Sequence, residues 1–197
     1  MDDIFNDLID AYVADKVGVS ENFLSVNLSK TLKSNLIELN KANKLLAAKT
    51  GNGDDTLLSP LVRSDKIFWL DRVHQNPAEN AFLDLMDAFV LYLNKTCYTG
   101  ITGYEFHYAM YEKGSFYKKH YDQFKSNASR QYTMIFYLNT DWTLTDGGEL
   151  CVYLDGLPIN ITPTNGKSVF FKSSEIEHEV LLSNAQRMSI TGWFKVD

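Results

Sequence analysis

The chain has 197 residues, of which 45% are hydrophobic and 22% charged, and its formal net charge is −6. This composition is typical of one globular domain with a substantial buried core. No run of Lys or Arg exceeds two residues, and no apolar stretch approaches the roughly 18 residues of a membrane span. The sequence therefore argues against nucleic-acid binding, a membrane-surface patch and a transmembrane segment.

The first half of the chain predicts helices. Apolar residues recur at helical spacing in residues 5–13 and again in residues 28–46, with Ser20 as the expected N-cap of the second helix. A third helix is expected to start at Pro77, with Asn76 as its N-cap. All three are expected to pack against the fold and not to carry chemistry.

The segments before the third helix have a different texture. Residues 49–60 (KTGNGDDTLLSP) hold turn-forming residues without periodicity, which predicts either a plain connector or a lid over a site. Residues 61–70 (LVRSDKIFWL) predict a strand with Arg63 and Asp65 on one face.

From residue 98 onward the sequence predicts β structure. Residues 104–110 alternate between large apolar side chains and other types, and a turn follows at residues 113–114. Further strands are expected at 131–139, 149–154, 157–161, 168–171 and 187–196. Short strands separated by turns favour an antiparallel sandwich or roll, so the predicted fold class is α+β.

The acidic N-terminus, Met1–Asp3, has no hydrophobic signal segment. Cys97 and Cys151, the only two cysteines, lie among apolar residues. We therefore expect reduced core cysteines in a cytoplasmic protein.

A candidate metal site begins at His120 and Asp122. In an extended segment these two side chains point the same way, while Tyr121 points to the opposite side and into packing. One imidazole beside one carboxylate makes part of a metal site, which a second histidine would complete.

Three other histidines are available as partners. His74 precedes a helix cap and is expected at the surface, whereas His107 lies in a strand and faces either the surface or a pocket. His178 lies between two glutamates, a setting that by itself is more typical of a solvated histidine.

The last predicted strand supplies the context that favours His178. Alternation places Arg187, Thr191 and Trp193 on one face. An arginine on such a face needs an anionic partner, and its planar fork suits a carboxylate, to which Tyr137 could add a hydroxyl. His120, Asp122 and His178 would then hold a metal with open positions, as in non-haem Fe(II) oxygenases. Zinc is the alternative, but a zinc hydrolase would also need a general base, and none is favoured.

The same residues resemble the 2-oxoglutarate- and Fe(II)-dependent oxygenases. His120-x-Asp122, then His178, then Arg187 nine residues later, form the family pattern across roughly residues 61–195. LVRSDKIFWL, RQYTMIFYLNTDWTLTDGGELCVY and HEV…RMSITGWF are similar to segments of the prolyl 4-hydroxylase group, in particular the oxygen-sensing prolyl hydroxylases and their bacterial relatives.

This resemblance implies a double-stranded β-helix (jelly-roll) core in residues 61–197, supported by helices and a candidate lid in residues 1–60 of a single domain. It implies Fe(II) ligands at His120, Asp122 and His178, and 2-oxoglutarate bound by Arg187 and Tyr137. The remaining implied roles are co-substrate contact or pocket lining by Tyr111, Thr191 and Trp193, and substrate contact by Arg63, Asp65, Arg130 and the 49–63 loop.

The expected activity is hydroxylation of a prolyl residue in a protein or peptide, with O2 consumed, succinate and CO2 released, and L-ascorbate as reductant. The alternatives are the same chemistry on a free amino acid or other small molecule, or a non-catalytic jelly-roll binding module. The binding module is disfavoured because all five key positions hold competent residues, and the acidic charge disfavours a nucleobase substrate. A monomer without nucleic-acid or membrane partners is expected.

Overall fold

The computed structural model describes residues 2–48, 61–123 and 127–196, so the lid predicted for residues 49–60 lies outside the described residues. Within these ranges the helices are α1 (Asp2–Asp15), α2 (Val26–Lys41) and α3 (Pro77–Thr96), with short 3-10 turns η2 (Arg72–His74) and η3 (Leu144–Asp146). None of the helices in the described ranges is long and apolar enough to cross a membrane.

The described strands range from two to nine residues in length. They are β1 (Val17–Ser20), β2 (Leu46–Ala47), β3 (Lys66–Trp69), β4 (Gly103–Tyr111), β5 (Tyr117–His120), β6 (Arg130–Tyr137), β7 (Leu150–Leu154), β8 (Leu157–Ile161), β9 (Ser168–Lys172), β10 (Glu177–Val180) and β11 (Arg187–Lys195). The larger sheet has the order β1-β9-β6-β11-β4-β3-β2, and the smaller sheet has the order β5-β10-β7-β8. All neighbouring strands within these sheets are antiparallel.

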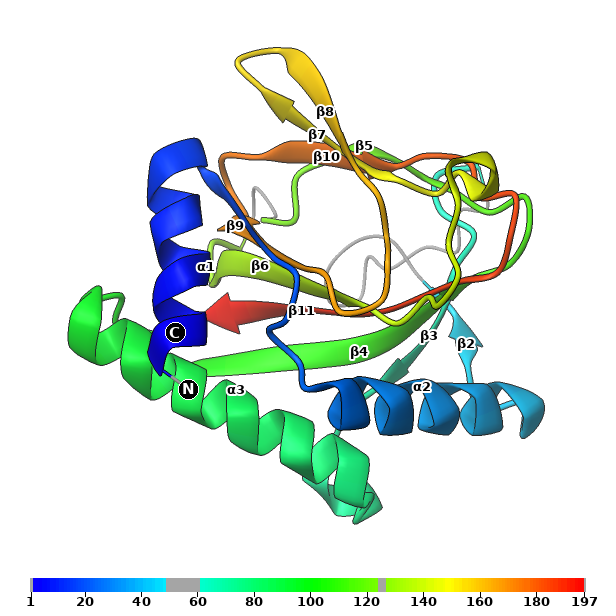
Figure 1. Cartoon of the computed structure of the whole chain (residues 1–197), viewed down its shortest axis with the longest axis horizontal. Helices are drawn as coiled ribbons and strands as arrows, with labels where there is room; N and C mark the ends of the chain where they lie inside the picture. Colours follow the sequence, from blue (N-terminus) through cyan, green and yellow to red (C-terminus); the bar gives the residue numbers. More distant parts are fainter. Residues whose placement is uncertain (1, 49–60, 124–126, 197) are drawn as a thin grey trace.

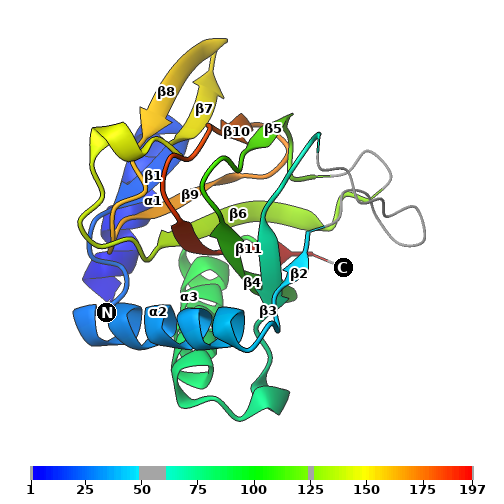
Figure 2. The same ribbon diagram turned by 90° about the vertical axis from the view of Figure 1, so that its right-hand side faces the viewer.

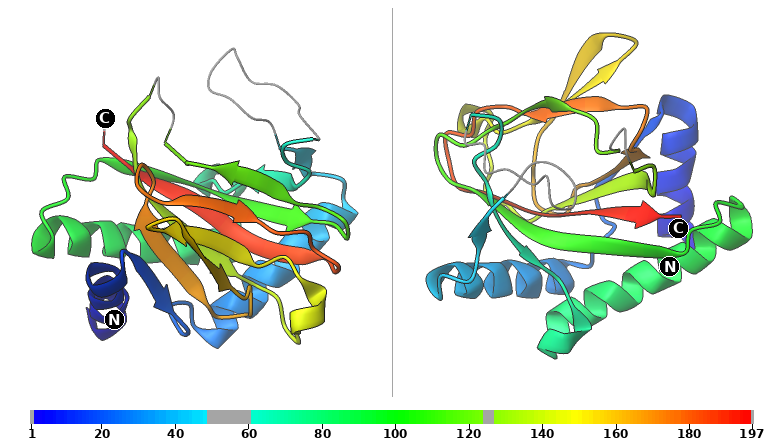
Figure 3. Two further views of the ribbon diagram at one scale, coloured as in Figure 1. Left: turned by 90° about the horizontal axis from the view of Figure 1, so that it is seen from above. Right: turned by 180° about the vertical axis from the view of Figure 1, so that it is seen from behind.

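The two sheets face each other and enclose the site. Figure 1 shows the smaller sheet on one side of the larger sheet, with α2 and α3 on the other side. Helix α1 packs along β1 and β9 at one edge of the larger sheet (Figure 3). The β7–β8 hairpin extends beyond the body of the molecule (Figure 2). This arrangement confirms the predicted α+β jelly roll with supporting helices.

The two largest of three hydrophobic clusters in the described residues hold the layers together. The larger core lies between the helices and the larger sheet, and its buried members include Leu32, Phe82, Phe89, Phe106 and Phe194. The smaller core lies between the two sheets, and its members include Ile135, Leu150, Val152, Val169 and Phe171. Alternate residues of the central strands contribute to opposite cores, which follows from the twofold period of a strand.

The capping of two helices tests the sequence signals. Asn76 Oδ1 accepts hydrogen bonds from the backbone N–H groups of Ala78 and Glu79, so the predicted cap of α3 is confirmed. The predicted cap of α2 is wrong, because Ser20 ends strand β1. Ser25 caps α2 instead, and its Oγ accepts a hydrogen bond from the backbone N–H of Leu28.

Strands β1 and β2 carry too few residues to show a periodic pattern, so the sequence did not predict them. Strand β1 is held close to α1 by Gly18, where an added Cβ would lie 2.5 Å from the carbonyl oxygen of Leu8. Leu46 lies in β2 and not at the end of a helix, since α2 stops at Lys41.

The cysteines differ in burial. Both are free thiols, and Cys151 is buried as expected. The expectation of a core position is wrong for Cys97, which is exposed at the C-cap of α3. The buried apolar residues of α3 end at Leu93, and the helix ends at Thr96, so Cys97 lies beyond the buried face.

Candidate metal centre

Two strands of the smaller sheet bring the predicted histidines together. His120 ends β5, and His178 lies opposite it in β10. The Nε2 atom of His120 lies 3.4 Å from Asp122 Oδ1, and Nε2 of His178 lies 3.5 Å from Asp122 Oδ2. One donor atom from each of the three residues lies within 4.8 Å of the others, a spacing that suits a shared metal ion.

Backbone carbonyls orient both imidazoles. Nδ1 of His120 lies 2.7 Å from the carbonyl oxygen of Lys118, and Nδ1 of His178 lies 3.1 Å from that of Ile176. Because a carbonyl oxygen only accepts hydrogen bonds, each Nδ1 carries a proton, and in the neutral imidazole Nε2 then carries the lone pair. Both lone pairs are thus available to a metal, and the backbone contact stiffens each ligand.

The protonation states also suit a metal. Burial lowers the pKa of His178 to about 4, so its imidazole is neutral at neutral pH. Burial alone would raise the pKa of Asp122, but His178, His120 and a hydrogen bond from Thr133 outweigh it and hold that pKa well below its usual range. A neutral imidazole and an ionised carboxylate are the forms that coordinate metals.

Thr133 supports the carboxylate from the floor of the site. Its Oγ1 donates a hydrogen bond of 2.8 Å to Asp122 Oδ2 and lies 2.9 Å from Ser173 Oγ. Thr133 lies in β6 and Ser173 directly follows β9, and both strands belong to the larger sheet. The larger sheet therefore positions Asp122, which lies beyond the end of β5 in the smaller sheet. Such outer contacts fix the geometry of a ligand.

A buried arginine lies at another end of the site. Arg187 is only 1% exposed, and its Nε donates a hydrogen bond to the carbonyl oxygen of Gly148 at 2.9 Å. Its guanidinium carbon lies 4.9 Å from the ring centre of Tyr111 and 5.0 Å from that of Tyr137. Among the described residues, no carboxylate lies within ion-pair distance of Arg187. A buried cation in this state calls for an anionic ligand.

Gly148 allows the arginine contact. Its φ is +64°, and an added Cβ would lie 2.8 Å from Ser183 Oγ and 3.2 Å from Arg187 Cδ. A side chain at this position would therefore clash with Ser183 and crowd Arg187, in a backbone conformation that favours glycine. The neighbouring tyrosines are equally enclosed, and burial raises the pKa of both Tyr111 and Tyr137, which keeps their hydroxyls protonated.

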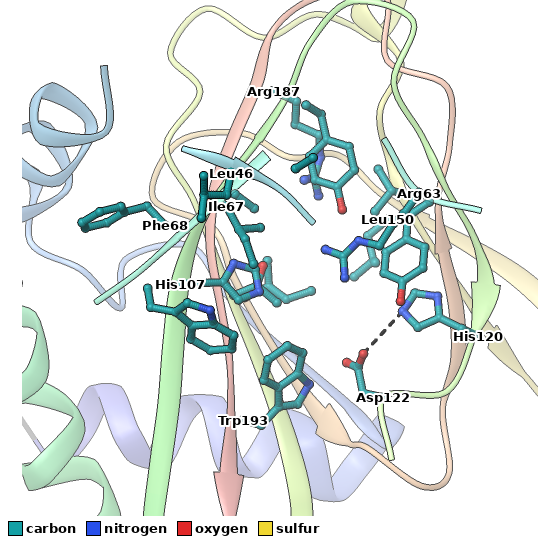
Figure 4. Close-up of a pocket in the computed structure, with 18 of the residues that line it drawn as sticks. Leu46, Arg63, Ile67, Phe68, His107, His120, Asp122, Leu150, Arg187 and Trp193 are labelled. Carbon is teal, nitrogen blue, oxygen red and sulfur yellow. Dashed lines mark ion pairs between the residues drawn. The ribbon is translucent and has the colours of Figure 1, made fainter. Parts of the chain in front are cut away.

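These groups share one cavity of about 560 Å³ between the two sheets. Figure 4 shows His120 and Asp122 on one side of it and His107 and Trp193 on another. The nine predicted site residues that line it are Arg63, Tyr111, His120, Asp122, Arg130, His178, Arg187, Thr191 and Trp193. The apolar part of the lining includes Ile67, Ala109, Ile135, Leu150 and Val180.

Two predicted site residues lie behind the cavity wall. Tyr137 is fully buried beside Arg187, and its hydroxyl has no hydrogen-bond partner among the described residues. Asp65 is also buried and accepts hydrogen bonds from Nε and Nη2 of Arg63, at 2.8 and 2.6 Å. The predicted pairing of Arg63 with Asp65 is thus present, with only the arginine facing the cavity.

The sequence reasoning missed Tyr117. Its ring stacks on the His120 imidazole with centroids 3.7 Å apart, and the Arg63 guanidinium carbon lies 4.4 Å from the centre of the Tyr117 ring. Simple alternation places residues 117 and 120 on opposite sides of a strand. An irregularity between β5 and β10, in which His178 pairs with His120 but Val180 pairs with Tyr117, brings them to the same side.

Two further cavity residues come from β3 and β4. His107, which the sequence left open between surface and pocket, is buried in the cavity wall. Its ring lies 5.1 Å from that of Trp69 and 5.6 Å from that of Trp193. Strand alternation with Tyr111 could have predicted the position of His107, whereas Trp69 depends on the pairing of β3 with β4.

The expectation for Tyr121 is wrong. It is 49% exposed and lines the mouth of the cavity, although alternation predicted burial in packing. The reason is that β5 ends at His120, so no neighbouring strand covers the next residue. His74, expected at the surface, is exposed there and its Nδ1 lies 2.8 Å from Glu79 Oε2.

The donor chemistry fits the metal and co-substrate that the sequence suggested. Two imidazoles and one carboxylate leave coordination positions open and suit Fe(II) better than Mg²⁺ or Ca²⁺, which prefer oxygen ligands alone. Arg187 lines the cavity and suits a carboxylate, and the unpartnered hydroxyl of Tyr137 belongs to the buried ring beside its guanidinium. An acid that binds both the metal and the arginine, such as 2-oxoglutarate, matches both ends of the site.

Comparisons with known proteins point the same way. A sequence model described as the 2OG-Fe(II) oxygenase superfamily matches residues 106–195. A prolyl-4-hydroxylase from Pseudomonas putida is 30% identical, with a TM-score of 0.87 over 98% of this chain and 99% of that chain.

Two more distant structures share the fold. A prolyl hydroxylase from Trichoplax adhaerens, solved with a peptide of the hypoxia inducible factor oxygen degradation domain, is 23% identical, with a TM-score of 0.86 over 98% of this chain and 89% of that chain. A prolyl 4-hydroxylase from Phytophthora capsici is 19% identical, with a TM-score of 0.76 over 98% of this chain and 64% of that chain.

Proposed function

The chain belongs to the 2OG-Fe(II) oxygenase superfamily, and on that premise we propose that it hydroxylates a prolyl residue in a protein substrate. The observation that carries the prolyl assignment is the end-to-end match with the P. putida prolyl-4-hydroxylase, which includes the regions outside the shared oxygenase segment. Regions outside the metal site are where substrate selection differs between enzymes that share one chemistry.

In this proposal His120, Asp122 and His178 hold Fe(II), and Arg187 with Tyr137 binds the far carboxylate of 2-oxoglutarate. Bound Fe(II) and 2-oxoglutarate would together supply an oxidation by O2. In this oxidation 2-oxoglutarate becomes CO2 and succinate, which takes up one oxygen atom of O2, and the other oxygen atom enters a substrate C–H bond as hydroxyl. The chain itself supplies placement, charge and exclusion of water.

The residues around the co-substrate orient it and exclude water from it. Arg187 carries its charge in a site closed to solvent, where a charged hydrogen bond is stronger than in water. Tyr111, directly opposite Arg187 in the strand pairing, keeps its hydroxyl proton and can donate it to a ligand oxygen. Thr191 and the apolar side chains of Ile67 and Leu150 fill the remaining wall.

The entrance supports a peptide substrate. Trp69 and Tyr121 are partly exposed where they line the cavity, and Tyr117 and Trp193 continue the aromatic surface inward. Prolyl rings pack well against aromatic faces, as they do in aromatic-lined grooves that bind proline-rich segments. Arg63, held by Asp65, adds a fixed donor in the cavity lining.

The direct test uses the purified chain with Fe(II), ascorbate, 2-oxoglutarate and a proteome extract as substrate. We expect succinate formation above the extract-free rate, together with prolyl residues heavier by one oxygen atom in peptide mass spectra. His120→Ala should reduce both signals to background because it removes a ligand. Tyr98→Ala, which truncates an aromatic side chain that is 88% exposed and does not line the cavity, is the control and should retain activity.

Undiminished succinate formation by His120→Ala would contradict the assignment of the metal site. Succinate formation that a free amino acid stimulates, and that no proline-containing peptide stimulates, would replace the prolyl substrate with a small molecule. Failure of the wild-type protein to bind Fe(II) would support a non-catalytic module.

A further inference from the structure

A cluster of three charged residues and one tryptophan lies beside the cavity, and none of its members is one of the three metal-ligand residues. It consists of Glu105 in β4, Arg130 at the start of β6, and Trp193 and Lys195 in β11. Glu105 lies opposite Trp193 in one strand pairing, and Arg130 lies opposite Lys195 in the next. The three strands therefore bring the cluster together by register and not through a loop.

Glu105 holds the arginine by its edge. Its Oε1 accepts hydrogen bonds from Arg130 Nε at 3.1 Å and from Arg130 Nη2 at 2.8 Å, while its Oε2 lies 3.3 Å from Lys195 Nζ. Burial alone would raise the pKa of Glu105, but the bonds from Arg130 and Lys195 outweigh it and lower that pKa, so the carboxylate is ionised at neutral pH.

The held guanidinium lies on the face of Trp193. The Arg130 guanidinium carbon is 3.4 Å from the ring centre, the distance of a close cation–π stack. Both residues line the cavity, and Trp193 is among the aromatic groups that face it in Figure 4. The arginine is thus fixed on two sides, by a carboxylate at its Nε–Nη2 edge and by an indole beneath its plane.

This arrangement changes what the arginine can select. A guanidinium with an open Nε–Nη2 edge grips a carboxylate with two parallel hydrogen bonds and would favour an acidic residue at the entrance. Here Glu105 occupies that edge and offsets the charge. The wall that the substrate meets is then a flat, largely compensated surface suited to an uncharged ring or side chain.

We propose that Glu105 is a positioning and specificity residue, which holds Arg130 against Trp193 so that the cavity accepts an uncharged residue of a peptide and disfavours an acidic one. This inference rests on the proposed function, because it concerns the peptide residue that lies beside the target. It differs from that function in naming a carboxylate that touches neither metal nor co-substrate.

Peptide binding without turnover tests the proposal. The probes are fluorescein-labelled peptides with a central proline and Ala, Lys or Glu next to it, bound to the Mn(II)-loaded protein under anaerobic conditions. For the wild type we expect the Ala peptide to bind more tightly than the Glu peptide. Glu105→Gln, which keeps the shape but removes the charge, should shift the Glu-to-Ala affinity ratio by about tenfold toward the Glu peptide.

Two further variants separate charge from structure. Glu105→Ala releases the edge of Arg130 entirely and should shift the ratio at least as far as Glu105→Gln. Glu112→Gln is the matched control, because Glu112 follows the same strand but contacts Lys66 and Gln186 instead. A merely structural role for Glu105 would weaken all three peptides equally and leave the ratio unchanged.

The outcomes are distinct from those for the proposed function. An unchanged ratio in both Glu105 variants, an equal change in Glu112→Gln, a wild type that prefers the Glu peptide, or a wild type that binds none of the peptides would each overturn the inference. A protein that shows the expected shift but hydroxylates no prolyl residue would keep the inference and lose the proposed reaction.

Discussion

The two faces of strands β4 and β11 are both largely buried, yet they carry opposite chemistry. One face packs against the helices with Phe106, Tyr108, Met110, Met188, Ile190 and Phe194. The other face presents His107, Tyr111, Arg187, Thr191 and Trp193 to the cavity. Because successive side chains of a strand point to opposite faces of the sheet, adjacent residues can belong one to the core and the next to the cavity.

Burial alone therefore does not distinguish core from site. The apolar face removes carbon surface from water and stabilises the fold by about 25 cal/mol for each Å² buried. The cavity face places a guanidinium and an imidazole where desolvation costs free energy, and within the described residues Arg187 has no carboxylate partner to offset this. Perturbed, buried polar groups that lower stability mark the functional face.

The largest expected effect concerns the apolar face. Phe106 is 1% exposed, and its ring lies 5.2 Å from that of Phe82 and 5.6 Å from that of Phe194. Phe106→Ala should lower the free energy of unfolding by about 3–5 kcal/mol, because it removes buried contacts and leaves a cavity. Urea denaturation followed by circular dichroism measures this effect.

Leu157→Ala is the control for that variant, since Leu157 is 70% exposed and its truncation should change stability by less than about 0.5 kcal/mol. The folded fraction of Phe106→Ala should bind 2-oxoglutarate with the wild-type affinity. A stable Phe106→Ala protein that has lost 2-oxoglutarate binding would show that the two faces are not separable.

The next effect concerns the cavity face and has the opposite signature. Arg187→Met should raise the dissociation constant for 2-oxoglutarate about 100-fold, because loss of a buried partner for a carboxylate costs about 2–5 kcal/mol. The free energy of unfolding without co-substrate should stay the same or rise, since Met replaces an uncompensated buried cation with an apolar chain. Calorimetric titration of the Mn(II)-loaded protein and urea denaturation measure the two quantities.

Arg72→Met is the matched control, because Arg72 makes exposed ion pairs with Asp84 and Asp87 away from the cavity. Neither the affinity for 2-oxoglutarate nor the stability should change much in this variant. If Arg187→Met lowers the free energy of unfolding and leaves the affinity for 2-oxoglutarate unaltered, Arg187 stabilises the fold and does not bind the co-substrate.

His107 sharpens the comparison through pH. Burial, with the nearby charge of Arg63, lowers its pKa from 6.5 to about 4 in the folded protein. Between these values the unfolded chain binds more protons, so the free energy of unfolding falls as the pH is lowered from 7 to 5, by about 2 kcal/mol for this group. Below about pH 4 the folded imidazole is protonated too, and this part of the loss stops growing.

His107→Leu removes that group and should lose about 2 kcal/mol less stability than the wild type between pH 7 and pH 5. His178 contributes equally in both proteins and cancels in the difference. The measurement is urea denaturation of the metal-free proteins at the two pH values. Parallel pH profiles would mean that His107 is hydrated and titrates normally, and the cavity wall would then not be closed at this position.

The sequence predicted which residues of β11 face the cavity where alternation was enough. Arg187, Thr191 and Trp193 share one side of β11, and all three line the cavity as expected. His120 and His178 come together because their strands pair, which the resemblance implied and the local sequence around His178 did not. Two flanking glutamates indicated a solvated residue, but His178 is 3% exposed.

Other residue positions depend on strand pairing between distant parts of the chain, which local sequence patterns do not predict. The irregularity between β5 and β10 places Tyr117 on His120, and the end of β5 exposes Tyr121. Ser20 looked like a helix cap because hydroxyl residues favour that position, but pairing with β9 outweighed the local preference. The sequence did not predict the contact between Glu105 and Arg130, because only the strand register brings these two residues together.

The smallest expected effect concerns Thr133 in β6, which supports the metal ligand Asp122. Thr133→Val keeps the shape of the side chain but removes the hydrogen bond to Asp122 Oδ2, so the carboxylate loses one of its orienting contacts. The affinity for Mn(II) or Fe(II) should fall about tenfold, the lower end of the range for such supporting contacts, with little change in the affinity of the loaded protein for 2-oxoglutarate.

Competition with a fluorescent chelator measures the metal affinity, and Thr140→Val, at an exposed threonine bonded to Lys33, is the control. An unaltered affinity in Thr133→Val would mean that His120 and His178 alone fix the position of Asp122. A loss of a thousandfold or more would place Thr133 among the groups without which the site does not form, and the larger sheet would then belong to the metal centre as much as the smaller one does.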